Sequence, residues 1–534
     1  MNNPKADFDV IVVGAGFAGL YGLYQFRDQG LSVQGFEAAS GVGGVWYHNR
    51  YPGARCDVDS IDYSFSFSPE LQREWAWTER YAAQPEILAY LDHVADRFDL
   101  RRLIRFSTRV TSAHRNDATG LWTVGDDQGG RTTCRFLVLA IGCLSTPRKP
   151  PFEGLDDFQG EWFMTAQWPH EPVDLAGKRV GLIGTGSSGV QSAPEIAKVA
   201  EHLYVFQRTP VFTIPARNHP TDPERAAAIK ARYEDYRREQ YKTRIGAYLP
   251  TTGKPSTEFT PEERQRLYAE RWTIGGGGLT ATFTNMLTSQ QTNDECAEFV
   301  RERIREIVED PKTAELLCPY DHPIGARRIC IDTDYYDTYN RPNVTLVDVR
   351  SDPIERITRT GLQTRSGAHY PLDVIVFAIG FDAVTGAAAQ IDIRNGRGEA
   401  LRDKWAHGPK TYLGLMTADF PNLFMVTGPG SPSVLVNMVP AVEHDIRWIS
   451  ELIRHMDEKG LRAIEASEAA EGEWVEHVAE VGARTLLPKA KSWYMGDNVA
   501  GKTRMLLAYC GGFNNYTDRV EQIVAAGYEG FAFS

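Results

Sequence analysis

Near the N-terminus a short apolar run is followed by a glycine turn and then by apolar residues at helical spacing. Residues 10–13 read as a buried strand, the turn is Gly14-Ala15-Gly16-Phe17-Ala18-Gly19, and residues 20–26 read as a helix. Glycines let the backbone approach a pyrophosphate, and the helix N-terminus offers free N–H groups. The next predicted strand ends in Glu37, where an acid can accept from ribose hydroxyls. A glycine turn without ligand is the weaker interpretation, since strand, helix and acid occur together.

The same pattern recurs in the middle of the chain. A strand at residues 179–183 leads into Gly184-Thr185-Gly186-Ser187-Ser188-Gly189 and a second helical pattern. The strand after that helix ends in Arg208 where the first unit has an acid. A basic residue there suits a 2′-phosphate, so the second unit is predicted to bind NADPH and the first FAD. The alternative is a surface arginine on an NAD site.

The remaining segments indicate which parts of the chain are helical and which form strands. Residues 58–100 show helical patterns, whereas residues 103–138 alternate with period two, which predicts a small antiparallel ribbon. Residues 136–142 and 373–380 each read as a strand that ends in glycine and closes a nucleotide unit. Between them, residues 216–320 show helical periods with proline-led caps after Asp222 and Thr260, a third helix that stops at Pro311, and a glycine run at 275–278 expected to be a mobile loop.

These patterns predict an α/β fold with two Rossmann-like dinucleotide-binding domains, the second nested in the first, and a helical insertion. The predicted FAD-binding domain comprises residues 1–145 and 383–534. The predicted NADP-binding domain comprises residues 146–215 and 323–382, and the insertion spans residues 216–322.

Composition excludes several classes of function. The chain of 534 residues has 58 Lys and Arg against 70 Asp and Glu, a net charge of −12 that disfavours nucleic acid as a partner. Its seven cysteines lack CxxC spacing, which argues against a disulfide scaffold, a cysteine zinc site or a redox dithiol, and we expect no metal. Without a long apolar run or a signal peptide, we expect a cytoplasmic protein, with no membrane partner, that is a monomer or a weak oligomer.

Two nested dinucleotide units indicate an enzyme that passes hydride from NADPH to a flavin. A disulfide reductase would need a cysteine pair near the flavin, and only Cys56 lies close to the first unit in the sequence. A monooxygenase needs no such pair, because the reduced flavin itself reacts with dioxygen. The sequence therefore favours a flavin monooxygenase.

A segment before the second glycine turn makes a resemblance specific. Residues 158–169, FQGEWFMTAQWP, resemble the fingerprint F-x-G-x-x-x-H-x-x-x-W-P of type I Baeyer–Villiger monooxygenases, with Met164 in place of histidine. Residues 43–47, 50–57, 335–344 and 428–433 also match, and the last of these stretches most resembles the phenylacetone and steroid monooxygenase branch. Met164 is open to three interpretations: natural tolerance, weakened activity or an engineered change. We favour tolerance, since the other matched positions are intact.

The resemblance implies roles for particular residues. Arg328 matches the arginine that supports the peroxyflavin anion, and Asp57 matches the acid that orients it; from the residues alone, they would be a surface charge and a loop-capping carboxylate. Ser433, Val434 and Leu435 match a loop that lines the substrate pocket. The positions implied to bind the cofactors FAD and NADPH are Gly14, Gly16, Gly19, Glu37, Gly44, Val45, Trp46, Asp57, Tyr63, Thr185, Gly186, Ser187, Ser188, Gly189, Arg208, Thr209, Arg327 and Trp493, the last on a mobile loop.

The implied activity is insertion of one oxygen atom from O2 beside a ketone carbonyl through a C4a-peroxyflavin, which gives an ester or lactone, with sulfoxidation as a side activity. An N- or S-hydroxylating flavin monooxygenase is the alternative, although its fingerprint usually lacks the pair Trp168-Pro169. A non-catalytic NADPH- or FAD-binding sensor is a remote alternative.

Overall fold

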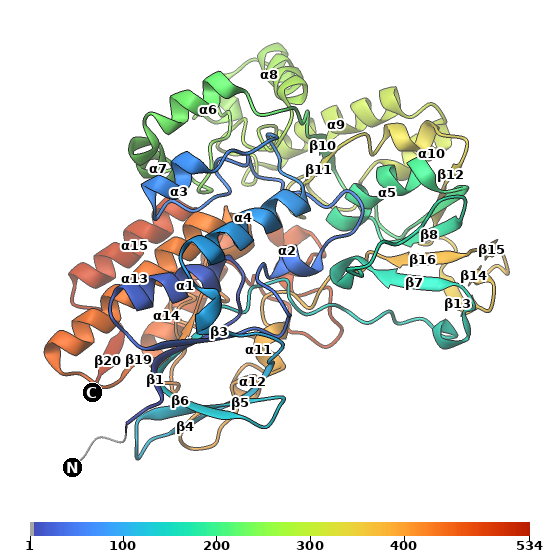
Figure 1. Ribbon diagram of the computed structural model, residues 1–534. Coiled ribbons are helices and arrows are strands. Elements are labelled where there is room, and N and C mark those ends of the chain that lie inside the picture. The colour runs from blue at the N-terminus through green and yellow to red at the C-terminus, as the bar shows by residue number, and fades with distance from the viewer. Residues whose placement is uncertain (1–4) are drawn as a thin grey trace.

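The computed structural model describes residues 5–534 and contains two separate, largely parallel sheets (Figure 1). The first sheet has the order β17-β4-β5-β6-β1-β2-β3, and β18 also pairs with β6. The β4–β5 and β5–β6 pairs are antiparallel, which confirms the predicted ribbon. Its strands are β1 (Phe8–Val13), β2 (Val33–Phe36), β3 (Ile104–Arg105), β4 (Val110–Asn116), β5 (Leu121–Asp126), β6 (Arg131–Leu139), β17 (Asp392–Arg394) and β18 (Leu423–Met425).

Helices from both ends of the chain pack against the first sheet in a common apolar core. Leu20, Leu23 and Phe26 of α1 are buried in the same cluster as Ile446 and Ile449 of α13, and the two helices are in contact. Burial of such side chains supplies most of the favourable free energy of folding. The helices of this part are α1 (Phe17–Asp28), α2 (Val45–His48), α3 (Pro69–Glu74), α4 (Gln84–Arg97), α11 (Gly386–Ala389), α12 (Leu401–Lys404), α13 (Met438–Lys459), α14 (Glu468–Ala483) and α15 (Phe513–Ala525).

The second sheet is entirely parallel, with the order β12-β9-β8-β16-β7. Helix α5 (Ser187–Val199) follows its central strand β8. All five strands come from residues 161–377, whereas the first sheet takes strands from either side of this segment, so the second unit is nested in the first as predicted. The strands are β7 (Glu161–Met164), β8 (Arg179–Ile183), β9 (His202–Gln207), β12 (Val344–Asp348) and β16 (Val374–Phe377), with the ribbon β13 (Ile354–Thr358), β14 (Gly361–Thr364) and β15 (His369–Pro371).

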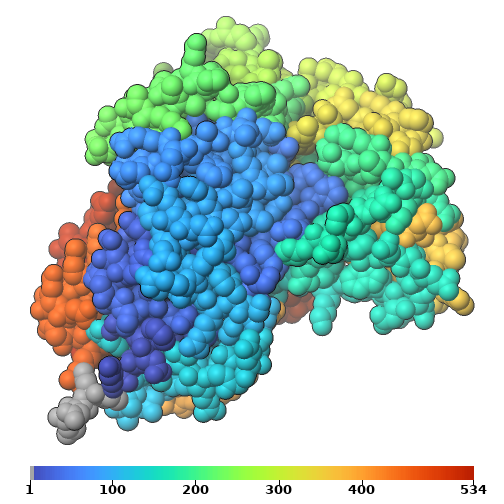
Figure 2. All heavy atoms as spheres, viewed as in Figure 1, coloured from blue at the N-terminus to red at the C-terminus, as the bar shows by residue number. Residues whose placement is uncertain are grey.

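A predominantly helical segment lies between β9 and β12 and extends across both sheet units (Figures 1 and 2). Asp222 caps its first helix by accepting from the Glu224 and Arg225 amides, and Thr260 forms a capping box with Glu263, as the proline-led patterns indicated. Its helices are α6 (Pro223–Lys230), α7 (Tyr233–Tyr241), α8 (Pro261–Ile274), α9 (Gln290–Ile307) and α10 (Pro311–Leu317). Two short strand pairs complete the fold: β10 (Thr213–Pro215) with β11 (Cys330–Asp332), and β19 (Ile464–Ala466) with β20 (Phe531–Phe533).

Two expectations for this segment were wrong in detail. Helix α9 ends at Ile307, and Pro311 begins α10 rather than stopping its predecessor. Proline is well suited to the first turn of a helix, where its missing N–H costs nothing. The glycine run at 275–278, predicted to be a mobile loop, is a largely buried turn: a Cβ on Gly276 would lie 2.0 Å from Tyr81 Oη. The glycines there serve close packing.

No helix among residues 5–534 has the length and apolar character needed to cross a membrane.

Asn422 is predicted to hold the first sheet to the C-terminal segment. It is fully buried with φ +61°, its Nδ2 donates to the carbonyl oxygens of Arg135 (3.1 Å) and Arg462 (3.0 Å), and its Oδ1 accepts from the Ile464 amide (2.9 Å). Asn422→Gly should lower the free energy of unfolding by about 2 kcal/mol, since buried partners lose their hydrogen bonds. Asn422→Ala should cost about 1 kcal/mol more because of the positive φ. Denaturant unfolding of both variants checks this, and equal stability of the alanine variant and the parent would contradict it.

Candidate active site

The first glycine turn joins β1 to α1 and has no room for a side chain at its first and last glycines. Gly14 has φ +106°, and a Cβ there would lie 2.4 Å from the Ala140 carbonyl oxygen. A Cβ on Gly19 would lie 1.8 Å from the Gly14 carbonyl oxygen, and Gly16 faces the backbone of Gly44. No side chain of the described residues caps the N-terminus of α1, so its first amides are free to bind an anion.

Glu37, at the end of β2, is buried against this turn. Its Oε2 accepts from the Ala15 amide (2.7 Å) and its Oε1 from the Ala39 amide (2.8 Å). Burial raises the pKa of this carboxyl, and the two amides offset part of the rise. A carboxylate can accept about four hydrogen bonds, so capacity is left for the ribose hydroxyls that the sequence predicts.

The other residues predicted for the first unit gather beside the turn. Gly44 has φ +57° and precedes α2, which begins at Val45. Trp46 Nε1 donates to Tyr63 Oη at 3.2 Å, and the Tyr63 ring packs edge-on against Phe17, the first residue of α1. The structure therefore brings these residues together around one helix N-terminus.

The second glycine turn repeats the first with one informative difference. A Cβ on Gly184 would lie 2.4 Å from the Ala378 carbonyl oxygen, and one on Gly189 would lie 2.1 Å from the Gly184 carbonyl oxygen. At Gly186, by contrast, no described residue lies within 4 Å of a Cβ, and Gly186 and Ser187 are exposed. Thr185 Oγ1 donates to the Thr209 carbonyl (2.9 Å) and fixes the turn to the end of β9. The space over Gly186 is a cradle that a side chain would fill.

Four arginines lie near this turn. Arg208 follows β9, and Arg350 Nε donates to its carbonyl oxygen at 3.1 Å. Burial lowers the pKa of Arg327, and the charges of Arg208 and Arg350 lower it further, while Arg208 also acts on Arg148. Arg327 Nε is buried without a hydrogen-bond partner among the described residues. An unpaired donor among like charges suits a phosphate group.

The sequence analysis missed Arg148 and Arg350 in this group. Neither belongs to a glycine motif, and Arg350 becomes a neighbour of Arg208 only because β12 pairs with β9. The residues present fit a dinucleotide at each turn, and the arginines at the second turn fit one that carries an additional phosphate.

Arg328 and Asp57, both implied by the resemblance, form an ion pair. Arg328 Nε and Nη2 donate to Asp57 Oδ2 at 2.9 and 2.5 Å, and Nη1 donates to the Val434 carbonyl at 2.7 Å. The negative charge of Asp57 raises the pKa of Arg328, so the guanidinium stays charged. The side chains remain 31% and 25% exposed, which leaves the pair accessible to a small molecule.

Apolar residues surround the loop that contacts Arg328. The 3-10 turn Ser433–Leu435 holds Ser433, fully buried, at φ +44°, and Val434 packs in a cluster with Cys143, Tyr494 and Leu507. Trp493 belongs to the edge of this cluster, and its ring lies 4.5 Å from that of Tyr494. The predicted substrate loop and the predicted nicotinamide-covering tryptophan thus share one apolar wall.

The fingerprint segment lies on edge strand β7 and contacts both units. Met164 pairs in register with Phe377 on β16 and packs against an apolar cluster. The next residue, Thr165, donates from Oγ1 to Ser188 Oγ at 3.0 Å, and the Trp168 amide donates to the His48 carbonyl at 3.3 Å. Methionine therefore fits the packing at this position.

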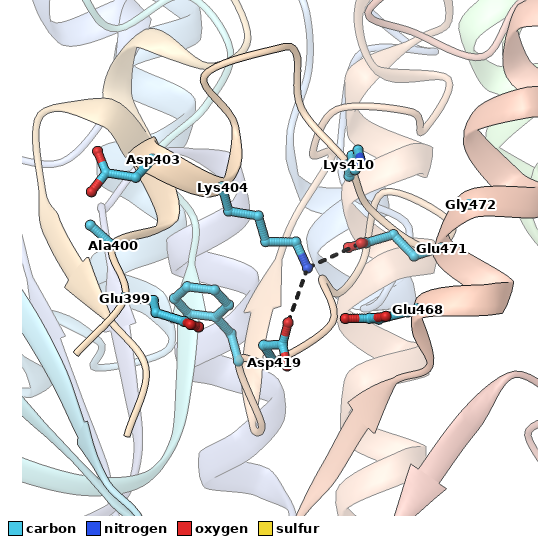
Figure 3. A pocket seen from close by; sticks show the side chains of 10 residues that line it. Glu399, Ala400, Asp403, Lys404, Lys410, Asp419, Glu468, Glu471 and Gly472 are labelled. Carbon is cyan, nitrogen blue, oxygen red and sulfur yellow. Dashed lines mark ion pairs between the residues drawn. The ribbon is translucent and has the colours of Figure 1, made fainter. Parts of the chain in front are cut away.

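A cavity of about 570 Å³ lies elsewhere, between residues 399–420 and α14 (Figure 3). Lys404 Nζ lies 3.0 Å from Glu471 Oε2 and 3.8 Å from Asp419 Oδ2, so its charge is neutralised within the wall. The residues that line it are distinct from those that the sequence analysis selected, and we assign it no role in the reaction.

Two glycine cradles, a nearby arginine group and an Asp57–Arg328 pair define a two-dinucleotide oxidoreductase.

Comparison with known proteins agrees. Residues 8–249 match the family model of flavin-binding monooxygenase-like proteins. A Baeyer–Villiger monooxygenase of Pseudooceanicola batsensis is 43% identical over 98% of this chain and 96% of its own length. A phenazine N-monooxygenase of Lysobacter antibioticus is 41% identical over 99% and 98%. A solved structure of oxidised steroid monooxygenase bound to NADP has 52% identity and a TM-score of 0.94 over 98% of this chain and 99% of that one.

The chain belongs to the Baeyer–Villiger monooxygenases of the flavin-binding monooxygenase family.

Gly186→Ala is predicted to weaken NADP⁺ binding with little loss of stability. The new Cβ meets no described residue within 4 Å, but Gly186 is the N-cap of α5, where alanine is less favourable than glycine, so the melting temperature should fall by no more than a few degrees. The same Cβ fills the cradle and should weaken NADP⁺ binding about tenfold or more, by displacing a phosphate from the helix N-terminus. Isothermal titration with NADP⁺ and thermal melting measure the two effects. Gly189→Ala is the matched control, because its Cβ meets the Gly184 backbone and should destabilise the fold itself. Unchanged affinity in Gly186→Ala would contradict the cradle.

Proposed function

We propose that the protein is an NADPH- and FAD-dependent Baeyer–Villiger monooxygenase that converts an apolar ketone to an ester or lactone. The balanced reaction is ketone + O2 + NADPH + H⁺ → ester + NADP⁺ + H2O. One oxygen atom enters between the carbonyl carbon and a neighbouring carbon, and the other leaves as water. The Arg328–Asp57 pair beside an apolar wall is the observation that carries this proposal.

The two glycine turns divide the cofactors between them. FAD is held at the first turn by Gly14, Gly16, Gly19 and Glu37, with Gly44, Val45, Trp46 and Tyr63 beside it. NADPH would be held at the second by Thr185, Gly186, Ser187, Ser188 and Gly189, where Arg208, Thr209 and Arg327 would bind its 2′-phosphate and Trp493 would cover its nicotinamide. Bound FAD accepts hydride from NADPH and activates dioxygen. Residues 1–145 with 383–534 and residues 146–215 with 323–382 form the corresponding domains, and residues 216–322 form the insertion.

Arg328 supplies positive charge where the reaction develops negative charge on oxygen. A guanidinium offers several N–H donors and does not give up its proton near neutral pH, so it stabilises an oxyanion without protonating it. Asp57 and the Val434 carbonyl occupy Nε, Nη2 and Nη1 and fix the plane of the group. A fixed charge needs little reorganisation as the reaction proceeds, which is the basis of electrostatic catalysis.

The substrate pocket is proposed at the loop Ser433, Val434 and Leu435. A ketone needs a polar group near its carbonyl oxygen and apolar contacts for its carbon skeleton. Val434 contributes to both, because its backbone carbonyl accepts a hydrogen bond from Arg328 while its side chain belongs to the apolar cluster. Apolar walls with few polar groups are typical of small-molecule sites. The site suits a ketone whose carbonyl faces Arg328 and whose carbon skeleton contacts the wall.

N-oxygenation of an aromatic heterocycle is a second candidate, favoured by the similarity to a phenazine N-monooxygenase over nearly the whole chain. The same Arg328 and apolar wall would serve a flat heteroaromatic substrate. Only the reacting atom of the substrate would differ.

Product analysis distinguishes the candidates. With FAD, NADPH and air, a mixture of aryl, cyclic and steroid ketones should give esters or lactones heavier by one oxygen atom, as measured by mass spectrometry. A parallel mixture of aromatic N-heterocycles should give less product. N-oxides without esters would overturn the ketone assignment, and NADPH consumption that yields only hydrogen peroxide with both mixtures would count against both.

Arg328→Ala should separate reduction from oxygenation. The variant loses the charge that stabilises oxyanion character, so ester formation should fall about 10²- to 10³-fold. Anaerobic reduction of FAD by NADPH should persist, because the arginine group and glycine cradles are unchanged. Stopped-flow reduction and ester yield are the measurements. Arg328→Lys keeps the charge but not the planar group of donors, so its ester yield should lie between those of the parent and Arg328→Ala. A normal ester yield from Arg328→Ala would contradict the role given to Arg328.

A further inference from the structure

Helix α5 touches the chain segments of both members of the Asp57–Arg328 pair. It begins directly at the second glycine turn, with Gly186 as its N-cap. Gln191, in its second turn, contacts the segment that leads to Asp57, while Ser187, its first residue, contacts the strand that follows Arg328. The helix that carries the nicotinamide cofactor's cradle is thus joined to the charged pair from two sides.

Gln191 uses both ends of its amide on residues 51–55. Its Oε1 accepts from Tyr51 Oη at 2.8 Å, and its Nε2 donates to the Arg55 carbonyl at 3.1 Å. Between these two contacts Gly53 has φ +82°, and a Cβ there would lie 2.2 Å from the Gln191 carbonyl oxygen. Residues 51–55 therefore pack directly against the backbone of α5, and Asp57 follows two residues later.

The far end of this segment is fixed to the first unit. Arg55 Nη1 donates to the Tyr81 carbonyl (2.7 Å) and to Glu79 (2.6 Å), and the Cys56 amide donates to the Ala82 carbonyl (3.0 Å). Residues 51–57 consequently span the two units, with Gln191 as a side-chain hydrogen-bond contact from the second.

The contact on the Arg328 side is weaker. Ser187 Oγ lies 3.4 Å from Cys330 Sγ, and burial raises the pKa of the Cys330 thiol to about 12, so the thiol is neutral at physiological pH. A neutral hydroxyl–thiol contact is a weak hydrogen bond. Gln191 is therefore the stronger of the two connections from α5 to the pair.

We propose that Gln191 is a positioning residue that couples occupancy of the second glycine turn to the placement of Asp57, and through Asp57 of Arg328. A phosphate at the turn binds the first amides of α5 and restrains the helix. The two Gln191 hydrogen bonds extend that restraint to residues 51–57. Oxygen transfer needs Arg328 correctly placed, whereas hydride transfer does not, so the coupling favours oxygenation while the nicotinamide cofactor is bound. This inference rests on the proposed function.

Hydrogen exchange tests the coupling without any ketone. In the FAD-loaded protein, NADP⁺ should slow amide exchange in peptides that cover residues 50–58 about threefold or more. Gln191→Leu, of similar size but without the amide, should abolish that slowing while peptides at the glycine turn itself are still protected. Tyr51→Phe removes only one of the two bonds and should give a partial loss. Lys198→Gln, an exposed change on the same helix, is the matched control and should behave like the parent.

Product partition gives the second readout. In Gln191→Leu the share of NADPH that ends as hydrogen peroxide rather than ester should rise several-fold, while anaerobic flavin reduction stays within about twofold of the parent. A purely structural role would lower the melting temperature and leave both the partition and the NADP⁺-induced protection unchanged, and that result would overturn the proposal.

The proposed function and the coupling through Gln191 are tested by separate results. A parent protein that makes no ester from any ketone defeats the proposed function, but the exchange experiment still reports whether Gln191 links the turn to residues 51–57. If Gln191→Leu does not fold, Tyr51→Phe carries the test, and full NADP⁺-induced protection in that variant would overturn the coupling.

Discussion

The ion pair between Arg328 and Asp57 sets a constraint that much of the architecture satisfies. Its partners lie 271 positions apart in the chain, and Arg328 also needs the Val434 carbonyl, another 106 positions away. A charged pair that is about three-quarters buried loses hydration on both sides, so it is favourable only if the geometry is fixed. Three segments, from both units and the C-terminal part, must therefore be docked before the pair can form.

Close packing at glycines contributes to this docking. Gly53 lies against α5, where a Cβ would fall 2.2 Å from the Gln191 carbonyl oxygen, and Gly276 lies against Tyr81, where a Cβ would fall 2.0 Å from Oη. The Gly53 contact brings main chains of the two units together without an intervening side chain, and the Gly276 contact places the helical segment against a side chain of the first unit. The absence of a side chain, which lets glycine approach a phosphate, thus also lets residues 51–57 pack directly on the helix that follows the second glycine turn.

Most of what the sequence predicted correctly depends on local patterns. Strand, glycine turn and helix follow one another within about 30 residues, so both units, their nesting and the caps at Asp222 and Thr260 could be inferred. The glycine run at 275–278 was misjudged because composition does not reveal what packs on a segment. Arg350 and Gln191 could not be found for the same reason: their partners, Arg208 and Tyr51, are set by strand pairing and helix docking over more than 100 positions. Asp57 and Arg328 were found only through resemblance to a family.

Met164 lies in the fingerprint segment, which connects the two units, and this connection tolerates methionine in place of histidine. The connection of the fingerprint to α5 runs through Thr165 Oγ1 and Ser188 Oγ, and its connection to the first unit runs through the Trp168 amide and the His48 carbonyl. Neither link uses the side chain at position 164, which packs among apolar residues beside Phe377. A histidine there would add hydrogen-bonding capacity and a charge near neutral pH. The contacts between the units form without either, so methionine removes titration from this connection and leaves its attachment to the second glycine turn intact.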